Sequence, residues 1–147
     1  MSDALEFELA VKCSSDHAFD VWANRTSMWW PRRHTRSGDP AAVVTFEPGA
    51  GGRVFERAPD GTEHDWGEVE VWDSPRRLVY LWHIYGERAD ATRVEIRLIG
   101  SGDTTTVKVT HTGWDRLGEK GRRLRERNES NWADLMTAYV PAAAAER

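Results

Sequence analysis

The side chains able to do chemistry are few in this chain and lie far apart along it. Its five histidines are at positions 17, 34, 64, 83 and 111, and none belongs to an HExxH pattern. Cys13 is the single cysteine, so the spacings typical of a Cys–Cys or Cys–His metal site are missing. The sequence therefore predicts no metal centre, and nothing in it indicates another cofactor.

Arrangements typical of nucleophilic or acid–base catalysis are missing as well. The chain has no GxSxG pattern, no credible histidine partner for Cys13, and no carboxylate pair whose spacing predicts proton transfer. We therefore predict no catalytic residues, and a binding protein is better supported than an enzyme. A cyclase could nevertheless act with one histidine, one arginine and a shaped site, so that alternative stays open.

Two polar residues are candidates for orienting a ligand. His111 ends the last predicted strand, on the same face as Val107 and Val109 and just before a helix. Its imidazole could hydrogen-bond a ligand, or it could satisfy a backbone carbonyl at the strand end. Asn128 lies on the predicted helix, where its amide could bind a ligand or pair with a side chain of the sheet.

Aromatic residues are the second conspicuous feature, because 147 residues include eight tryptophans. Each indole is a large rigid surface with one N–H to satisfy, so several are expected to line a site. In the stretch SMWWPRRH, Trp29 and Trp30 point in different directions in either a helix or a strand. Pro31 ends the helix there, so we predict one indole in the core and the other at a pocket mouth or on the surface.

Length, composition and charge limit the class of protein. The length suits one domain over residues 1–147, with 39% hydrophobic and 30% charged residues. No apolar run approaches 18 residues, so no membrane span is expected. The N-terminus does not resemble a secretion signal, and a lone cysteine fits a reducing compartment. A cytoplasmic protein is therefore expected. The net charge is −4, and acidic residues interrupt the basic run KGRRLRER, which indicates a solvated helix face rather than a nucleic-acid-binding surface.

The periodicity of apolar residues predicts an α+β fold. Alternation in LEFELAVKC indicates a half-buried strand, and SSDHAFDVWAN indicates a helix that Ser14 or Ser15 caps. From residue 42 onward, six apolar segments separated by turn residues predict six antiparallel strands, which makes seven in all. A helical period follows, clearest after Lys120 and ending at Pro141, and residues 141–147 are expected to fray.

The sheet and the long helix must bury their apolar faces against each other. A curved sheet bends away from a straight helix, and the gap that remains is a usual place for a small ligand unless large side chains close it. The sequence therefore favours a pocket between the sheet and the C-terminal helix.

The order and spacing of several motifs resemble one superfamily. They are WWP, FEPGAGGRVFE, DG, WGEVEVWDSPRRLVYLW, TRVEIRL, and HTGW with a tryptophan eighteen residues later. From Val11 to Tyr139 they resemble the START-like SRPBCC (Bet v 1-like) superfamily, and within it the branch related to the activator of the Hsp90 ATPase. The resemblance implies a helix-grip fold, in which a curved antiparallel sheet of about seven strands wraps around a long C-terminal helix and short helices follow the first strand.

The resemblance also implies which side chains face the cavity of that fold. It places these residues inward on two neighbouring strands: Gly67, Val69, Val71, Leu78, Tyr80 and Trp82. Trp66 and Trp72 are then expected on the outer face or at an edge, and Trp30 is favoured over Trp29 as the inward indole. Asn131 stands where relatives commonly have glycine, which implies a more polar lining.

These observations favour a domain that binds a small apolar or aromatic molecule in an internal, largely apolar cavity. The expected ligand-binding residues are Trp30, Phe46, Val69, Tyr80, Trp82, His111, Asn128 and Trp132. One alternative is a protein like the chaperone ATPase activators, acting through surface contacts. The other is an enzyme of the cyclase or dehydratase kind. Both a monomer and a homodimer are compatible with the sequence.

Overall fold

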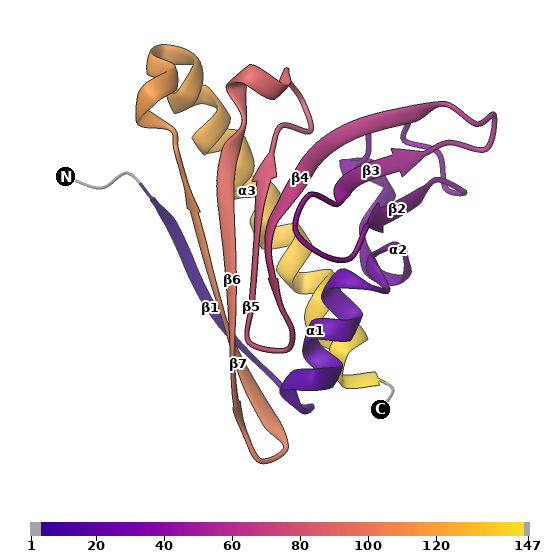
Figure 1. Cartoon of the computed structure of the whole chain (residues 1–147), viewed down its shortest axis with the longest axis vertical. Coiled ribbons are helices and arrows are strands. Elements are labelled where there is room, and N and C mark those ends of the chain that lie inside the picture. Colours follow the sequence, from indigo (N-terminus) through magenta and orange to yellow (C-terminus); the bar gives the residue numbers. More distant parts are fainter. Residues whose placement is uncertain (1–3, 146–147) are drawn as a thin grey trace.

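A computed structural model describes residues 4–145 of the chain. Seven strands form one antiparallel sheet in the order β1-β7-β6-β5-β4-β3-β2, and α3 runs along this curved sheet with α1 and α2 beside it (Figure 1). The predicted α+β helix-grip fold is confirmed. The strands are β1 (Leu5–Val11), β2 (Val43–Phe46), β3 (Arg53–Arg57), β4 (Glu63–Asp73), β5 (Arg77–Trp82), β6 (Thr92–Ser101) and β7 (Thr104–Thr112), and the helices are α1 (Ser15–Ala23), α2 (Thr26–Trp29) and α3 (Gly118–Ala145).

The helix α1 is fixed at its start by a cap and along its length by an apolar face. The Ser14 side chain accepts a hydrogen bond from the backbone N–H of His17 at 3.2 Å, which confirms one of the two predicted caps. Phe19 and Trp22 are buried on the inner side of α1. The hydroxyl of Tyr139 on α3 donates to the carbonyl oxygen of Ala18 at 2.7 Å, so α1 and α3 are joined directly.

The helix α3 continues beyond the proline at which we predicted its end. Pro141 lies inside α3, which runs to Ala145, so the prediction that the helix ends at Pro141 is wrong; residues 146–147 of the predicted tail lie outside the described part. Alanine is the best helix former, and Ala143 is fully buried, so propensity and packing together offset the hydrogen bond that proline cannot donate. Among residues 4–145, no helix is long and apolar enough to cross a membrane.

Two irregularities in β4 change which of its side chains face the helix. Between the pairs Val54–Gly67 and Phe55–Asp65 the register with β3 shifts by one residue, and Trp66 is left as the extra residue and is fully buried. The predicted outward position of Trp66 is therefore wrong.

The second irregularity lies between the pairs Val69–Tyr80 and Val71–Val79. Beyond it, Trp72 pairs with the buried Leu78 and its ring packs edge-on against Phe19 at 5.2 Å. Trp72 thus faces inward, and Val71 takes the outward position, in both cases opposite to our expectation. A one-residue slip reverses every later side chain of a strand, which explains both errors.

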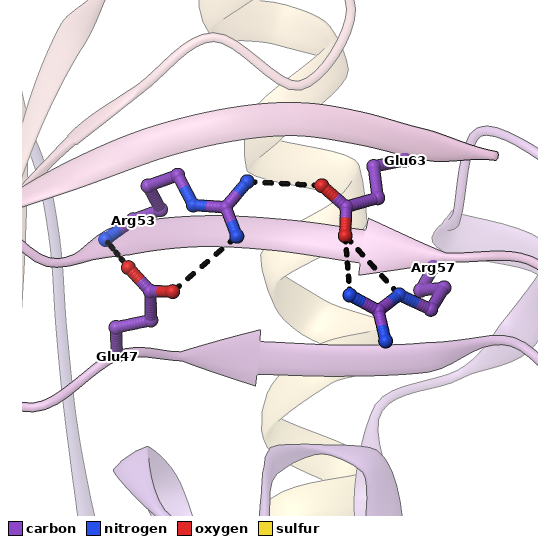
Figure 2. A network of polar contacts seen from close by, with 4 residues as sticks. All are labelled: Glu47, Arg53, Arg57 and Glu63. Atoms are coloured by element: carbon purple, nitrogen blue, oxygen red, sulfur yellow. Dashed lines mark hydrogen bonds and ion pairs between the residues drawn. The ribbon is translucent and has the colours of Figure 1, made fainter. Parts of the chain in front are cut away.

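An ion-pair network runs along β3 and links both of its ends to the residue after β2 and to the start of β4 (Figure 2). Arg53 contacts Glu63 at 3.0 Å and Glu47 at 3.3 Å, and Arg57 contacts Glu63 at 2.5 Å. The hydrogen bonds from Arg57 and Arg53 lower the pKa of Glu63. All four side chains are partly or largely exposed, so the network orders the edge of the sheet more than it adds to the stability.

A buried carboxylate holds the segment that follows α2 against the sheet. Glu56 is fully buried, and its carboxylate accepts hydrogen bonds from the backbone N–H groups of Arg36 (2.7 Å) and Ser37 (2.9 Å) and from Nε1 of Trp66 (3.2 Å). Burial alone raises the pKa of Glu56, but the hydrogen bonds from Ser37 and Arg36 outweigh it and the pKa lies below its ordinary value. The negative charge of Glu56 is therefore part of the folded structure.

We expect Glu56→Gln to lower the free energy of unfolding by about 2 kcal/mol at pH 7, because an amide offers one acceptor oxygen where three donors converge. Urea unfolding at pH 7 measures this loss. Glu70→Gln is the control, since Glu70 is exposed and pairs with Arg93 at 3.2 Å, and its loss should be below about 0.5 kcal/mol. Equal losses in the two variants would contradict the assigned role of Glu56.

Candidate ligand-binding site

A pocket of about 390 Å³ lies between the segment from Trp82 to Thr92 and the N-terminal half of α3. Pockets that bind small molecules have volumes of roughly 300–1,000 Å³ and mostly apolar walls with a few polar groups. The residues that give this pocket its character are Trp82, Ile84, Tyr85, Trp114, Leu124 and Asn128. In residues 4–145, no three His, Cys, Asp or Glu side chains are placed to bind a metal ion.

Arginine side chains fix the segment between β5 and β6 that forms one wall of the pocket. The guanidinium of Arg36, in the segment between α2 and β2, donates to the carbonyl oxygen of Ile84 at 2.9 Å. The guanidinium of Arg116 donates to the carbonyl oxygen of Ala89 at 3.1 Å, from the side of α3. Because both bonds are charge-assisted, this wall is held in place without a ligand.

The interior beneath Trp132, where we expected the main cavity, is filled by aromatic rings. The space there measures about 10 Å³, which is about the least that holds one water. The ring of Trp82 lies 5.7 Å from that of Trp30 and 5.5 Å from that of Trp66. The inward turn of Trp66 adds a large ring that the sequence analysis did not place here, so the structure does not show the expected internal cavity.

The paired indoles of Trp29 and Trp30 are both buried, so our prediction that one lies at the surface or at a pocket mouth is wrong. The helix α2 ends at Trp29, and the extended backbone of Trp30 turns the second indole into a neighbouring part of the core. Trp29 packs on Trp22 of α1, at 5.1 Å between ring centres, while Trp30 packs on Trp66 of the sheet at 5.3 Å. The two rings therefore fill adjacent parts of one core.

His111 is fully buried, and both of its ring nitrogens are hydrogen-bonded to side chains. Nε1 of Trp132 donates to Nδ1 of His111 at 3.0 Å. The proton of a neutral ring is then on Nε2, which donates to the hydroxyl of Thr92 at 2.6 Å. Burial lowers the pKa of His111 to about 3, so the ring is neutral at physiological pH. His111 thus links Trp132 of α3 to Thr92 of β6. Its ring bonds two side chains, and not the backbone carbonyl at the strand end that we considered as an alternative.

A sequence model of the family described as activator of Hsp90 ATPase homolog 1-like proteins matches residues 12–140. The chain belongs to this family. It thereby also belongs to the START-like SRPBCC superfamily that the sequence motifs resemble, and the predicted family is confirmed.

Solved structures similar to this family member include an anthrahydroquino-γ-pyrone synthase, Txn09, complexed with SUM; it is 30% identical over 82% of both chains, with a TM-score of 0.61. The self-sacrificing resistance protein CalC from Micromonospora echinospora is 23% identical over 98% of this chain and 97% of its own, with a TM-score of 0.70. The Aha1 dimer from Colwellia psychrerythraea is 13% identical over 97% and 96%, with a TM-score of 0.67. The last two likenesses establish the fold alone. No curated protein matches the chain significantly.

The structure brings only part of the predicted binding set to the large pocket of this family member. Trp82 and Asn128 line it, and they also line the 10 Å³ space beneath it. Trp30, Tyr80 and Trp132 line that small space and form the floor under the pocket. The remaining predicted residues line neither space and pack in the core, and they are Phe46, Val69 and His111.

Four residues that shape the pocket were not predicted: Ile84, Tyr85, Trp114 and Leu124. Apolar residues continue through Tyr85 in RLVYLWHIY, whereas β5 ends at Trp82 and the chain leaves the sheet there. The motif HTGW was a usable signal, because it places Trp114 at the turn between the last strand and the helix. Leu124 belongs to the apolar stripe of the helix, but nothing in the sequence places it opposite the β5–β6 connection.

Proposed function

We propose that this protein binds a small, flat aromatic molecule in the pocket between the β5–β6 connection and α3. The observation that carries the proposal is a pocket of about 390 Å³ whose walls include Trp82, Tyr85 and Trp114. Aromatic walls bind aromatic ligands by burying apolar surface, at about 25 cal/mol per Å² before the costs of association, and by stacking. Trp82 and Asn128, both predicted from the sequence, belong to the proposed site.

The likeness to Txn09 supports the choice of ligand class. That synthase is named for an anthrahydroquinone fused to a pyrone, a flat polycyclic aromatic, and it is 30% identical to this chain. A pocket of this volume has room for two or three fused rings.

We expect Leu124→Trp to weaken binding at least tenfold, because the larger side chain fills the space between α3 and the opposite wall. Isothermal titration calorimetry with 2-naphthol and 2-hydroxyanthraquinone measures the dissociation constants. Glu126→Trp is the control, because Glu126 is exposed on the same helix and lines neither space, and it should bind as the wild type does. The proposal fails if the wild type binds neither compound, or if Leu124→Trp binds both as tightly as the wild type.

A second candidate is an enzyme of the cyclase kind that folds a polyketide-type substrate in the same pocket. The specific observation in its favour is that the 30% identical relative is described as a synthase. Mass spectrometry of a bound aromatic precursor after incubation distinguishes the two. A binding protein returns the compound unchanged, whereas a cyclase converts it in the wild type and not in Leu124→Trp.

Regulation of a chaperone through surface contacts is less well supported by the geometry. Interfaces with large partners usually present a contiguous apolar patch of several hundred Å². The large hydrophobic side chains most exposed within residues 4–145 are Met28, Val43 and Ile99, which lie on three different elements. These exposed side chains give the surface less support than the aromatic walls give the pocket, and we therefore propose the pocket as the functional site.

A further inference from the structure

The amide of Asn128 offers the pocket an acceptor that the protein itself does not use. Asn128 lies in the middle of α3, is 7% exposed, and lines both the pocket and the small space below it. Its Nδ2 donates to the carbonyl oxygen of Leu124, one turn earlier, at 2.8 Å. This bond directs Nδ2 back along the helix and leaves Oδ1 to face another way.

Oδ1 of Asn128 accepts no hydrogen bond from the described residues. It is also not among the fully enclosed polar atoms that have no partner within residues 4–145, so it is open to the space that Asn128 lines. A polar atom this deep costs free energy unless it is hydrogen-bonded, and here only a guest molecule or water can supply the donor.

Two other polar side chains around the pocket, those of Lys120 and Thr92, already have partners. Nζ of Lys120 contacts the carboxylate of Asp90 at 2.9 Å, at the rim. The Thr92 hydroxyl accepts from His111 and lies 3.3 Å from the carbonyl oxygen of Trp82.

His83 lies near Asp65, with Nε2 and Oδ2 3.5 Å apart; both of its ring nitrogens lack a hydrogen-bond partner within residues 4–145, but they are enclosed by protein and so are closed to a ligand. Glu87 is exposed at the outer rim. Among the side-chain acceptors that line the pocket, Oδ1 of Asn128 is thus the one at depth that is left for a ligand, and the indole N–H of Trp82 is an unpartnered donor beside it within residues 4–145.

We propose that Oδ1 of Asn128 accepts a hydrogen bond from a hydroxyl group of the bound aromatic, so that the pocket selects phenols over the same ring system without a donor. This inference rests on the proposed function and names the ligand class for that site. A buried acceptor disfavours an analogue that lacks the donor, because the acceptor is then desolvated without a partner.

The experiment compares 2-naphthol with 2-methoxynaphthalene by calorimetry at pH 7. The two compounds share one ring system, but only the first has a hydroxyl proton to donate. We expect the wild type to prefer 2-naphthol at least tenfold. Asn128→Leu should lose this preference and bind 2-methoxynaphthalene no more weakly than the wild type does. Asn128→Ala is a second variant, and both replace asparagine by better helix formers, so the helix should persist.

Glu126→Leu is the matched control, because Glu126 is exposed on the same helix and lines neither space, and the preference of this variant for 2-naphthol should be unchanged. Equal affinity of the wild type for both compounds would overturn the inference and leave the proposed function standing. A preference for 2-naphthol that persists in both Asn128 variants would likewise overturn the inference and leave the proposed function standing. If neither compound binds the wild type, the proposed function fails, and this inference fails with it.

Discussion

Lowering the pH from 6.5 to 4.5 should reduce the free energy of unfolding by about 2 kcal/mol through His111 alone. The pKa of His111 is lowered from 6.5 to about 3 by burial, so the unfolded chain takes up the proton first as the pH falls. A group whose pKa is lower in the folded state stabilises the fold fully above its unfolded pKa and loses that contribution as the pH falls. By pH 3 the accumulated loss should reach roughly 4 kcal/mol.

His111→Gln tests this expectation, because glutamine can still accept from Trp132 and donate to Thr92 but does not titrate. Urea unfolding at a series of pH values above 4.5, the ordinary pKa of glutamate, separates the histidine from the carboxylates. Subtracting the free energy of unfolding of the variant from that of the wild type at each pH removes the contribution of the other histidines. The stability of the wild type should fall more steeply than that of His111→Gln by about 2 kcal/mol over this window. Parallel curves would mean that His111 is protonated as easily in the folded protein as in the unfolded chain.

Trp22→Ala should lower the free energy of unfolding by about 3–5 kcal/mol, because it removes the ring on which helices α1, α2 and α3 meet. Trp22 is 1% exposed, and its ring lies 4.7 Å from Tyr139, 5.1 Å from Trp29 and 6.0 Å from Trp132. These neighbours are themselves large rings in a packed core and have little freedom to close the gap, so most of a cavity should remain.

Differential scanning calorimetry should show a midpoint about 10 °C lower or more for Trp22→Ala. Met28→Ala is the control, because Met28 is 53% exposed on α2, and its midpoint should change little. A small shift for Trp22→Ala would mean that the core can repack around the missing indole.

Much of the architecture followed from periodicity in the sequence. Alternation of apolar residues predicted the strands, and short turns between them predicted antiparallel neighbours, as the sheet order confirms. The change to a helical period after His111 predicted the long helix. Each strand and each helix must bury one face in the core. Its apolar residues therefore recur with the period of a strand or of a helix, and this period can be read from the sequence.

The interior of the fold could not be predicted in the same way. The two register shifts of β4 depend on how β3 and β5 pair with it, and nothing local in WGEVEVW marks them. They bring Trp66 inward against Trp30 and Trp82, where its ring helps to fill the space expected for the cavity, and they bring Trp72 against Phe19 of α1. The pocket itself lies between two segments that are remote in sequence, around Tyr85 and Leu124, and their proximity is a product of the whole fold.

The pairing of β1 with β7 has a consequence for the order of events during synthesis. Leu5 pairs with His111 and Val11 with Thr105, so the first strand made must wait for the last strand of the sheet. At ribosomal rates of about 5–20 residues per second, this delay is roughly 5–20 s. The nascent chain can join β2 to β6 while the N-terminal segment is still unpaired, and the sheet closes only after β7 has emerged.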